Sequence, residues 1–292
     1  LVTMEWFNDV WMKEVFANLM ADKILEHSGG KSGNLEFLLE HYPSAYAVDR
    51  TAGNHPIRQQ LLNLNQASTM YGTIIYDKAP IVMHQLEKML GAERFRDGIR
   101  QYLKTYANGN ANWNDLIAIF QNGNDDSVAT WNDNWINKAG RPVFGYEVSQ
   151  SQGKITGLTI KQKAEHADDA LGAQKFMIAL VYGDRIEPVA VDIRDVTVAI
   201  EAVIGKNVPD YILFNASGNG YGSFPVDVKM LPSIARLKDD VMRASAYLNS
   251  YESMLTGGSL TPRALLDLYQ NNFATEENLL LLERIKRQYR NT

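Results

Sequence analysis

Glu14 is the first residue whose type and position suggest chemistry. It lies in the segment Leu1 to Ala21, whose apolar residues recur at the spacing of a helix. Its helical neighbours at three and four positions are small, polar or apolar but uncharged: Val10, Trp11, Ala17 and Asn18. A carboxylate on such a face needs a metal ion, a basic group or a proton, because an unpaired buried charge is costly. From spacing alone, a basic partner is the commonest of these.

Tyr76 is the second candidate for chemistry. It lies at the predicted start of a helix, where Asp77 is a plausible cap and Pro80 falls in the first turn. Taken by itself, a tyrosine at such a place is most often a core residue with a hydrogen-bonded hydroxyl. None of the five histidines lies in an H-E-x-x-H motif: His27, His41, His55, His84 and His166. We interpret His55, in a Gly-Asn-His-Pro turn, as a turn or packing residue.

The elements that must position these side chains change in type along the chain. Amphipathic patterns predict helices up to about Phe144, with Asn8 or Asp9 as the first cap, Gly91 as a stop signal and Asn112 with Asp115 as a capping box. From Gly145 the period shortens to that of antiparallel strands. Helical spacing returns near Pro232, and Thr275 is predicted to begin the last helix.

Composition narrows the class of protein. The chain has 292 residues, of which 45% are hydrophobic and 22% charged, as is usual for a globular protein. A net charge of -5 disfavours nucleic acid as the main partner. The chain has no cysteine, which excludes disulfides and thiolate chemistry. No apolar run is long enough to predict a membrane span, and the first residues do not form a signal peptide.

The first seventeen residues closely resemble a segment of the aminopeptidase N family of gluzincin metallopeptidases. They read L-V-T-M-E-W-F-N-D-V-W-M-K-E-V-F-A, and the family has G-N-L-V-T and then W-L-N-E-G-F-A after its H-E-x-x-H motif. In that family the last Glu is the third zinc ligand, and Glu14 matches it. The run around Tyr76 is similar to the family's I-x-Y-x-K-G-A, whose tyrosine donates to the oxyanion.

The resemblance extends nearly continuously to Phe144 and implies a multidomain α+β fold. Residues 1–144 would be the C-terminal helical part of a thermolysin-like peptidase domain. Residues 145–229 would form a small antiparallel β-sandwich, and residues 230–292 the first helices of an α-helical solenoid domain. The four leucines near the start of the last helix would then be left exposed unless further protein covers them.

The resemblance also implies a function. The parent protein would be a zinc-dependent aminopeptidase that hydrolyses N-terminal residues from peptides, with Glu14 on Zn²⁺ and Tyr76 at the oxyanion. By the family spacing, the second His of the zinc motif falls about six residues before Leu1. One carboxylate cannot hold a catalytic zinc, so we expect this chain alone to be metal-free and inactive. Its partners would be peptide substrates and the missing N-terminal part of the same protein; a cytoplasmic parent is favoured over a periplasmic or secreted one.

Two alternatives stay open from the sequence. One is a non-catalytic relative that keeps the fold as a scaffold or a peptide-binding surface, which Val15 favours because the family usually has Gly at that position. The other is the epoxide-hydrolysing branch of the same scaffold. That branch passes from its catalytic domain directly to a helical domain, and the strand-rich residues 145–228 disfavour it.

Overall fold

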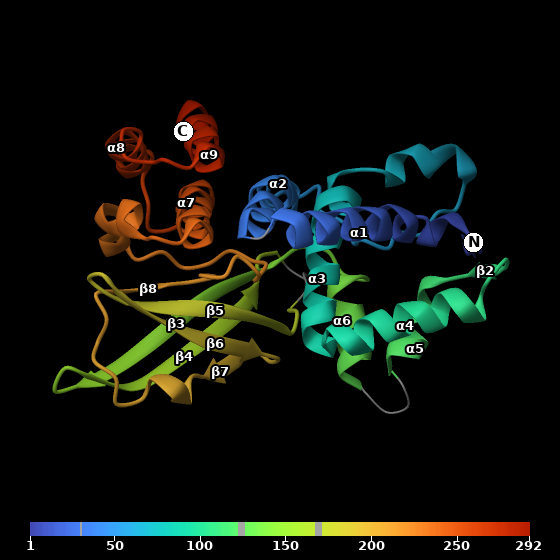
Figure 1. Ribbon diagram of the computed structural model, residues 1–292, viewed down its shortest axis with the longest axis horizontal. Coiled ribbons are helices and arrows are strands. Elements are labelled where there is room, and N and C mark those ends of the chain that lie inside the picture. Colours follow the sequence, from blue (N-terminus) through green and yellow to red (C-terminus); the bar gives the residue numbers. More distant parts are fainter. Residues whose placement is uncertain (30, 122–125, 167–170) are drawn as a thin grey trace.

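Helices precede and follow a block of strands in this chain (Figure 1). The computed structural model describes residues 1–29, 31–121, 126–166 and 171–292. The first helices are α1 (Trp11–Gly29), α2 (Lys31–Asp49), α3 (Ala79–Leu90), α4 (Ala92–Thr105), α5 (Trp113–Gln121) and α6 (Asp126–Trp135). The predicted mixed α+β class is confirmed. No helix within the described ranges is long and apolar enough to cross a membrane.

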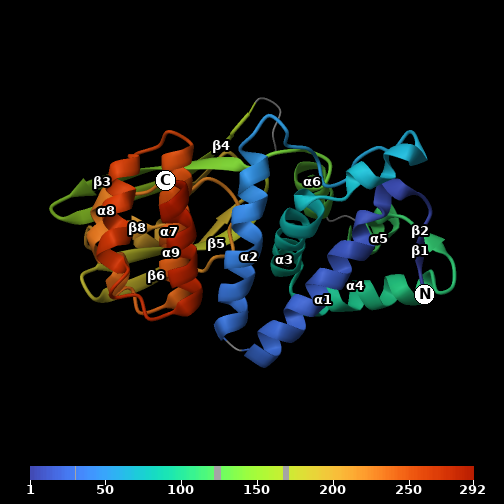
Figure 2. The ribbon, with the colours of Figure 1, turned by 90° about the horizontal axis from the view of Figure 1, so that it is seen from above.

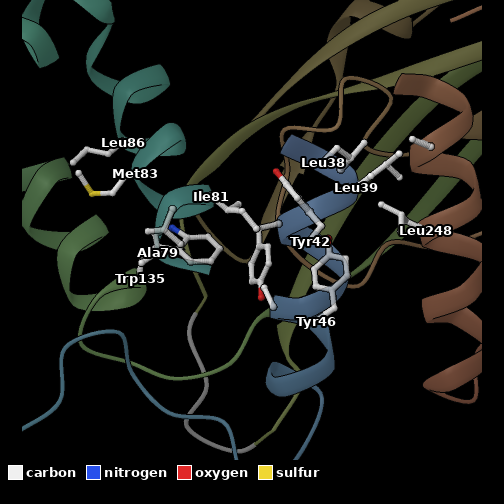
Figure 3. Close-up of a cluster of buried hydrophobic side chains, with 14 of the residues drawn as sticks. Leu38, Leu39, Tyr42, Tyr46, Ala79, Ile81, Met83, Leu86, Trp135 and Leu248 are labelled. Atoms are coloured by element: carbon white, nitrogen blue, oxygen red, sulfur yellow. The ribbon is translucent and has the colours of Figure 1, made fainter. Parts of the chain in front are cut away.

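Helix α2 connects the first helices to the C-terminal helices. It contacts α1 and α3 on one side and the C-terminal helices on the other, and Figure 2 shows it standing between these two groups. Its buried side chains include Leu38, Tyr42 and Tyr46. Figure 3 shows them facing Ile81 of α3 on one side and Leu248 of the C-terminal helices on the other. One hydrophobic core therefore connects the two ends of the sequence.

Local sequence signals explain several helix boundaries. Pro80 occupies the first turn of α3, and Gly91 ends this helix with a φ of 86°, which residues with a side chain rarely adopt. The capping box before α5 is confirmed: the Asn112 N–H donates to the Asp115 carboxylate, and the Asp115 N–H donates to the Asn112 side chain.

The caps predicted for α1 and α3 were wrong. The Asn8 side chain accepts instead from the Leu61 N–H at 2.6 Å, and Asp9 pairs with Arg58 at 2.7 Å. Asp77 lies inside a helical turn and pairs with His41. Each of these polar groups has a partner distant in sequence, which outweighs the local capping preference.

A short parallel pair joins β1 (Thr3–Met4) to β2 (Asn110–Ala111), and the later strands form small antiparallel sheets. Within the described residues, β3 (Pro142–Ser151), β4 (Lys154–Ala164) and β7 (Thr197–Ala199) make one three-stranded sheet. A second sheet contains β6 (Arg185–Ile193), β5 (Gln174–Tyr182) and β8 (Tyr211–Leu213). Side chains from both sheets share a core that includes Ile160 and Ile178. The domain boundary predicted after Phe144 lies within β3, and the domain division stays a prediction.

Within the described residues, three α-helices follow the sheets: α7 (Asp240–Leu255), α8 (Pro262–Asn272) and α9 (Leu279–Asn291). Thr261 caps α8 through the Ala264 N–H. The start predicted at Thr275 was wrong, because the Asn278 side chain accepts from the first N–H groups of α9 and caps it there. Leu279 is 75% exposed and Leu280 41% exposed, whereas Leu281 is buried.

Candidate active site

Two segments far apart in the sequence meet at the candidate site. Helix α1 carries Glu14, and the π-helical turn η3 (Ile74–Lys78) carries Tyr76. The helix and the turn pack against each other, and α2 and α3 contact the turn from other sides. Glu14 and Tyr76 are near enough for the charge of the carboxylate to act on the phenol. The structure thus brings together the two residues that the sequence singled out.

The turn η3 holds Tyr76 at the surface while its neighbours point inward. Ile74, Ile75 and Lys78 are buried, whereas Tyr76 is 37% exposed. The N–H groups of Ile75 and Tyr76 both donate to the Gly72 carbonyl, at 2.9 and 3.0 Å. Single π-helical turns of this kind are frequent at functional sites, because the extra residue redirects a side chain.

Glu14 has a basic partner next to it in the sequence. Its side chain is 24% exposed and pairs with the Lys13 Nζ at 3.1 Å. From spacing alone a basic partner was favoured for Glu14, and in the structure that partner is the neighbouring Lys13, with Glu14 at the edge of the apolar face. The Lys13 Nζ also lies 5.8 Å from the centroid of the Tyr71 ring. Its hydrogen bond to Glu14, followed by the charge of Tyr71, raises the pKa of Lys13.

The surroundings of Tyr76 favour its neutral form. Partial burial, followed by the charge of Glu14, raises the pKa of the Tyr76 phenol above its ordinary value. The phenol therefore keeps its proton at neutral pH and can donate a hydrogen bond. Asn18, one turn after Glu14, donates from its side chain to the Tyr76 carbonyl at 3.4 Å, which adds a second contact between α1 and the turn.

Lys13 and Tyr71 are site residues that the sequence reasoning missed. Lys13 had one signal, since it stands where the aminopeptidase N pattern commonly has Asn, but a lysine beside a carboxylate is ordinary on a helix surface. Tyr71 had no signal, because it lies outside the matched run and its proximity depends on the path of the loop before η3.

The donor atoms for a metal are incomplete in the described part of the chain. No three His, Asp or Glu side chains there are grouped closely enough to hold an ion. Glu14 offers one carboxylate. His55 has its Nδ1 2.9 Å from the Pro56 carbonyl in a turn, in agreement with its interpretation as a turn residue.

Comparisons with known proteins add to this geometry. Residues 1–135 match the Peptidase family M1 domain. The chain is 25% identical over 311 residues to Aminopeptidase N of Streptomyces lividans, with 99% of this chain and 36% of that protein aligned. It is 26% identical over 292 residues to Tricorn protease-interacting factor F2 of Thermoplasma volcanium, covering 99% of this chain and 35% of the relative.

A plant relative matches about half of the chain. Aminopeptidase M1-D of Oryza sativa subsp. japonica is 32% identical over 148 residues, which are 51% of this chain and 17% of the relative. The chain spans about a third of the length of the Streptomyces and Thermoplasma relatives.

Proposed function

We propose that this chain, whose residues 1–135 match the Peptidase family M1 domain, supplies part of the active site of a zinc-dependent aminopeptidase of the aminopeptidase N family of gluzincin metallopeptidases. The reaction is hydrolysis of the N-terminal residue from a peptide. The observation that carries the proposal is the packing of α1 against the turn η3, which brings the partly exposed side chains of Glu14 and Tyr76 to one site.

In this proposal Glu14 is one of the zinc ligands. A catalytic zinc needs three protein ligands, and no group of three such side chains occurs within the described residues, so we expect the isolated chain not to hold the ion. The two remaining ligands would be the histidines of an H-E-x-x-H segment preceding Leu1 in the parent protein. When bound, zinc would polarise the scissile carbonyl and lower the pKa of a coordinated water.

Tyr76 is the residue that stabilises the oxyanion in this proposal. A neutral phenol at a fixed position can donate a hydrogen bond as the peptide carbonyl oxygen gains charge. Its exposure leaves the hydroxyl accessible to a substrate, and the anchored turn η3 limits the rearrangement needed when the charge develops. Both features are those expected of an oxyanion donor.

The domain layout belongs to the same proposal. Residues 1–144 are the C-terminal helical part of a thermolysin-like domain, residues 145–229 a β-sandwich and residues 230–292 the start of an α-helical domain. The order of helices, antiparallel sheets and helices supports this layout. Val15 is fully buried in the core, so its replacement of Gly does not fill the exposed side of Glu14.

The test compares this chain with the native polypeptide that contains it. We would sequence the residues before Leu1, then measure bound zinc and cleavage of aminoacyl-4-nitroanilides by both proteins. We expect an intact H-E-x-x-H, stoichiometric zinc and cleavage in the native protein, and neither zinc nor cleavage in this chain alone. Glu14→Gln should remove zinc from the native protein, whereas Glu283→Gln, at an exposed side chain, should not.

A degraded motif before Leu1 would contradict the proposal. Glu14 would then have no metal to bind, and a scaffold or peptide-binding role would replace catalysis. Stoichiometric zinc in the isolated chain would contradict the expected inactivity of the fragment.

A further inference from the structure

A buried polar chain joins the sheets to the turn that carries Tyr76. It consists of Tyr221 after β8, Asp49 at the end of α2 and Lys78 at the end of η3. The Lys78 Nζ lies 2.8 Å from the Asp49 Oδ2, and the Tyr221 hydroxyl donates to the same oxygen at 2.8 Å. All three residues are fully buried. The Lys78 Nζ also donates to the Gly140 carbonyl at 2.7 Å, between α6 and β3.

The position of Tyr221 is itself fixed by the sheet. The Gln174 side chain, at the start of β5, accepts from the Tyr221 N–H at 2.8 Å and donates to the Tyr221 carbonyl at 3.0 Å. The glycines on both sides have no room for a side chain: a Cβ at Gly220 would lie 2.9 Å from Phe176, and one at Gly222 would lie 2.7 Å from Phe144. The loop therefore holds the phenol rigidly against Asp49.

The hydroxyl of Tyr221 donates a hydrogen bond to Asp49 and stays neutral. Burial, followed by the nearby carboxylate of Asp49, raises the pKa of Tyr221 well above its ordinary value, so the hydroxyl stays protonated. The Lys78 ammonium also lies 5.7 Å from the centroid of the Tyr221 ring. Asp49 thus accepts from one cation and one neutral donor, which fixes its orientation.

We propose that Tyr221, Asp49 and Lys78 are positioning residues through which the strand-bearing part of the chain fixes the turn that presents Tyr76. Lys78 belongs to the same five-residue turn as Tyr76, so an anchored Lys78 side chain constrains the backbone from which the tyrosine extends. A buried ion pair is poor at stabilising a fold compared with apolar packing, and its best-attested use is to specify one arrangement. The effect expected on catalysis rests on the proposed function of Tyr76. The anchoring of the turn does not depend on that function.

The structural test is hydrogen–deuterium exchange of the backbone amides in residues 72–79. Tyr221→Phe removes only the hydroxyl that orients Asp49. Tyr269→Phe is the matched control, because its hydroxyl is also buried and donates to Gln288 at 3.0 Å in the C-terminal helices. We expect exchange in residues 72–79 to rise about fivefold in Tyr221→Phe, the effect of one lost hydrogen bond, and to stay unchanged in the control.

Exchange in residues 92–105 of α4 should stay unchanged in both variants, which separates a local loosening from general destabilisation. Equal exchange of residues 72–79 in the two variants would overturn the proposal. This test needs neither zinc nor activity, so its result is independent of the proposed function.

The catalytic consequence is tested in the native polypeptide with Asp49→Asn. We expect kcat per folded, zinc-loaded molecule to fall about tenfold with KM nearly unchanged, because a displaced oxyanion donor weakens the transition state. A purely structural role would lower the amount of folded enzyme and leave kcat per folded molecule unaltered, which would overturn the catalytic part. A native protein without peptidase activity would refute the proposed function and leave the exchange result standing.

Discussion

The imidazole of His41 lies between two carboxylates, with its Nε2 3.6 Å from Asp22 and its Nδ1 3.1 Å from Asp77. Burial lowers the pKa of His41, but hydrogen bonds and charges of Asp22 and Asp77 outweigh it and raise the pKa to about 9. His41 is therefore charged at neutral pH. Since the three residues come from α2, α1 and η3, this charge ties together the elements that form the candidate site.

The first prediction is a pH dependence of stability due to His41. Its folded pKa is raised from 6.5 to about 9, so its contribution is complete below pH 6.5 and is lost as the pH rises through about 9. We expect the charge of His41 to contribute about 2 kcal/mol of unfolding free energy at about pH 7.5 and almost nothing at about pH 10. The cost of His41→Gln should therefore be about 2 kcal/mol larger at the lower pH. Urea unfolding of both proteins at the two pH values measures the difference.

His84→Gln is the control for this prediction. Burial, followed by the charges of Lys88 and Lys23, lowers the pKa of His84 to about 3, so this histidine stays neutral between the two pH values. Its substitution should cost the same at both. A cost of His41→Gln that did not change with pH would show that His41 is not charged in the folded protein.

The second prediction concerns Tyr76 in the native, zinc-loaded polypeptide. Tyr76→Phe removes a hydrogen bond made to the developing oxyanion, so kcat should fall by about a hundredfold or more with little change in KM. Steady-state hydrolysis of an aminoacyl-4-nitroanilide gives both constants. Tyr71→Phe is a suitable comparison, since Tyr71 contacts Lys13 in the same site and is not the proposed donor. Comparable losses of kcat in the two variants would argue against the role of Tyr76.

The third prediction concerns the buried guanidinium of Arg141. It pairs with Glu165 at 2.7 Å and Glu252 at 2.9 Å, and lies 4.5 Å from the centroid of the Tyr46 ring. Arg141→Met leaves Glu165 without this partner, and we expect a loss of about 3 kcal/mol in unfolding free energy. Denaturant unfolding is the measurement.

An exposed pair provides the control for Arg141. Arg263 and Asp267 are exposed neighbours on α8, and Arg263→Met should change the unfolding free energy by less than about 0.5 kcal/mol. If both substitutions had small effects, the network around Arg141 would not contribute to stability as its burial implies.

The fourth prediction concerns the contact between α4 and α5. A Cβ at Gly98 would lie 2.4 Å from the ring of Phe120, which stacks on Phe95. Gly98→Ala gains about 1 kcal/mol of helix propensity but must displace a packed ring, so we expect a net loss of about 1–2 kcal/mol. Thermal unfolding compared with Gly145→Ala, where nothing lies within 4 Å, checks this. A more stable Gly98→Ala protein would show that the ring moves freely.

The parts of the structure that the sequence predicted are those set by local chemistry. Pro80, Gly91 and Asn112 mark helix boundaries through backbone geometry or a nearby N–H group, and these needed no knowledge of the rest of the chain. The change from helices to strands near Gly145 followed in the same way from the change in hydrophobic period. The pairing of Glu14 with Tyr76 became predictable only through the family resemblance.

The parts that the sequence did not predict depend on long-range partners. Asn8 has the sequence signature of a cap but accepts from Leu61, and Asp77 pairs with His41. The role of Lys78 was equally hidden, because a lysine in a helical turn is usually solvated, and its burial depends on Asp49 and Gly140. No spacing rule connects such residues.

The single core that includes residues from α1 to α9 has a consequence for how this architecture can diverge. Ala179 and Val181 of β5 pack in the same cluster as Trp11 of α1 and Leu248 of α7. If recombination exchanged only the strand-bearing segment between relatives, core side chains of β5 from one protein would pack against helix side chains of the other. A successful exchange thus requires matching substitutions in the strands and in the helices that they contact. The first helices, the strands and the C-terminal helices are therefore expected to be inherited together.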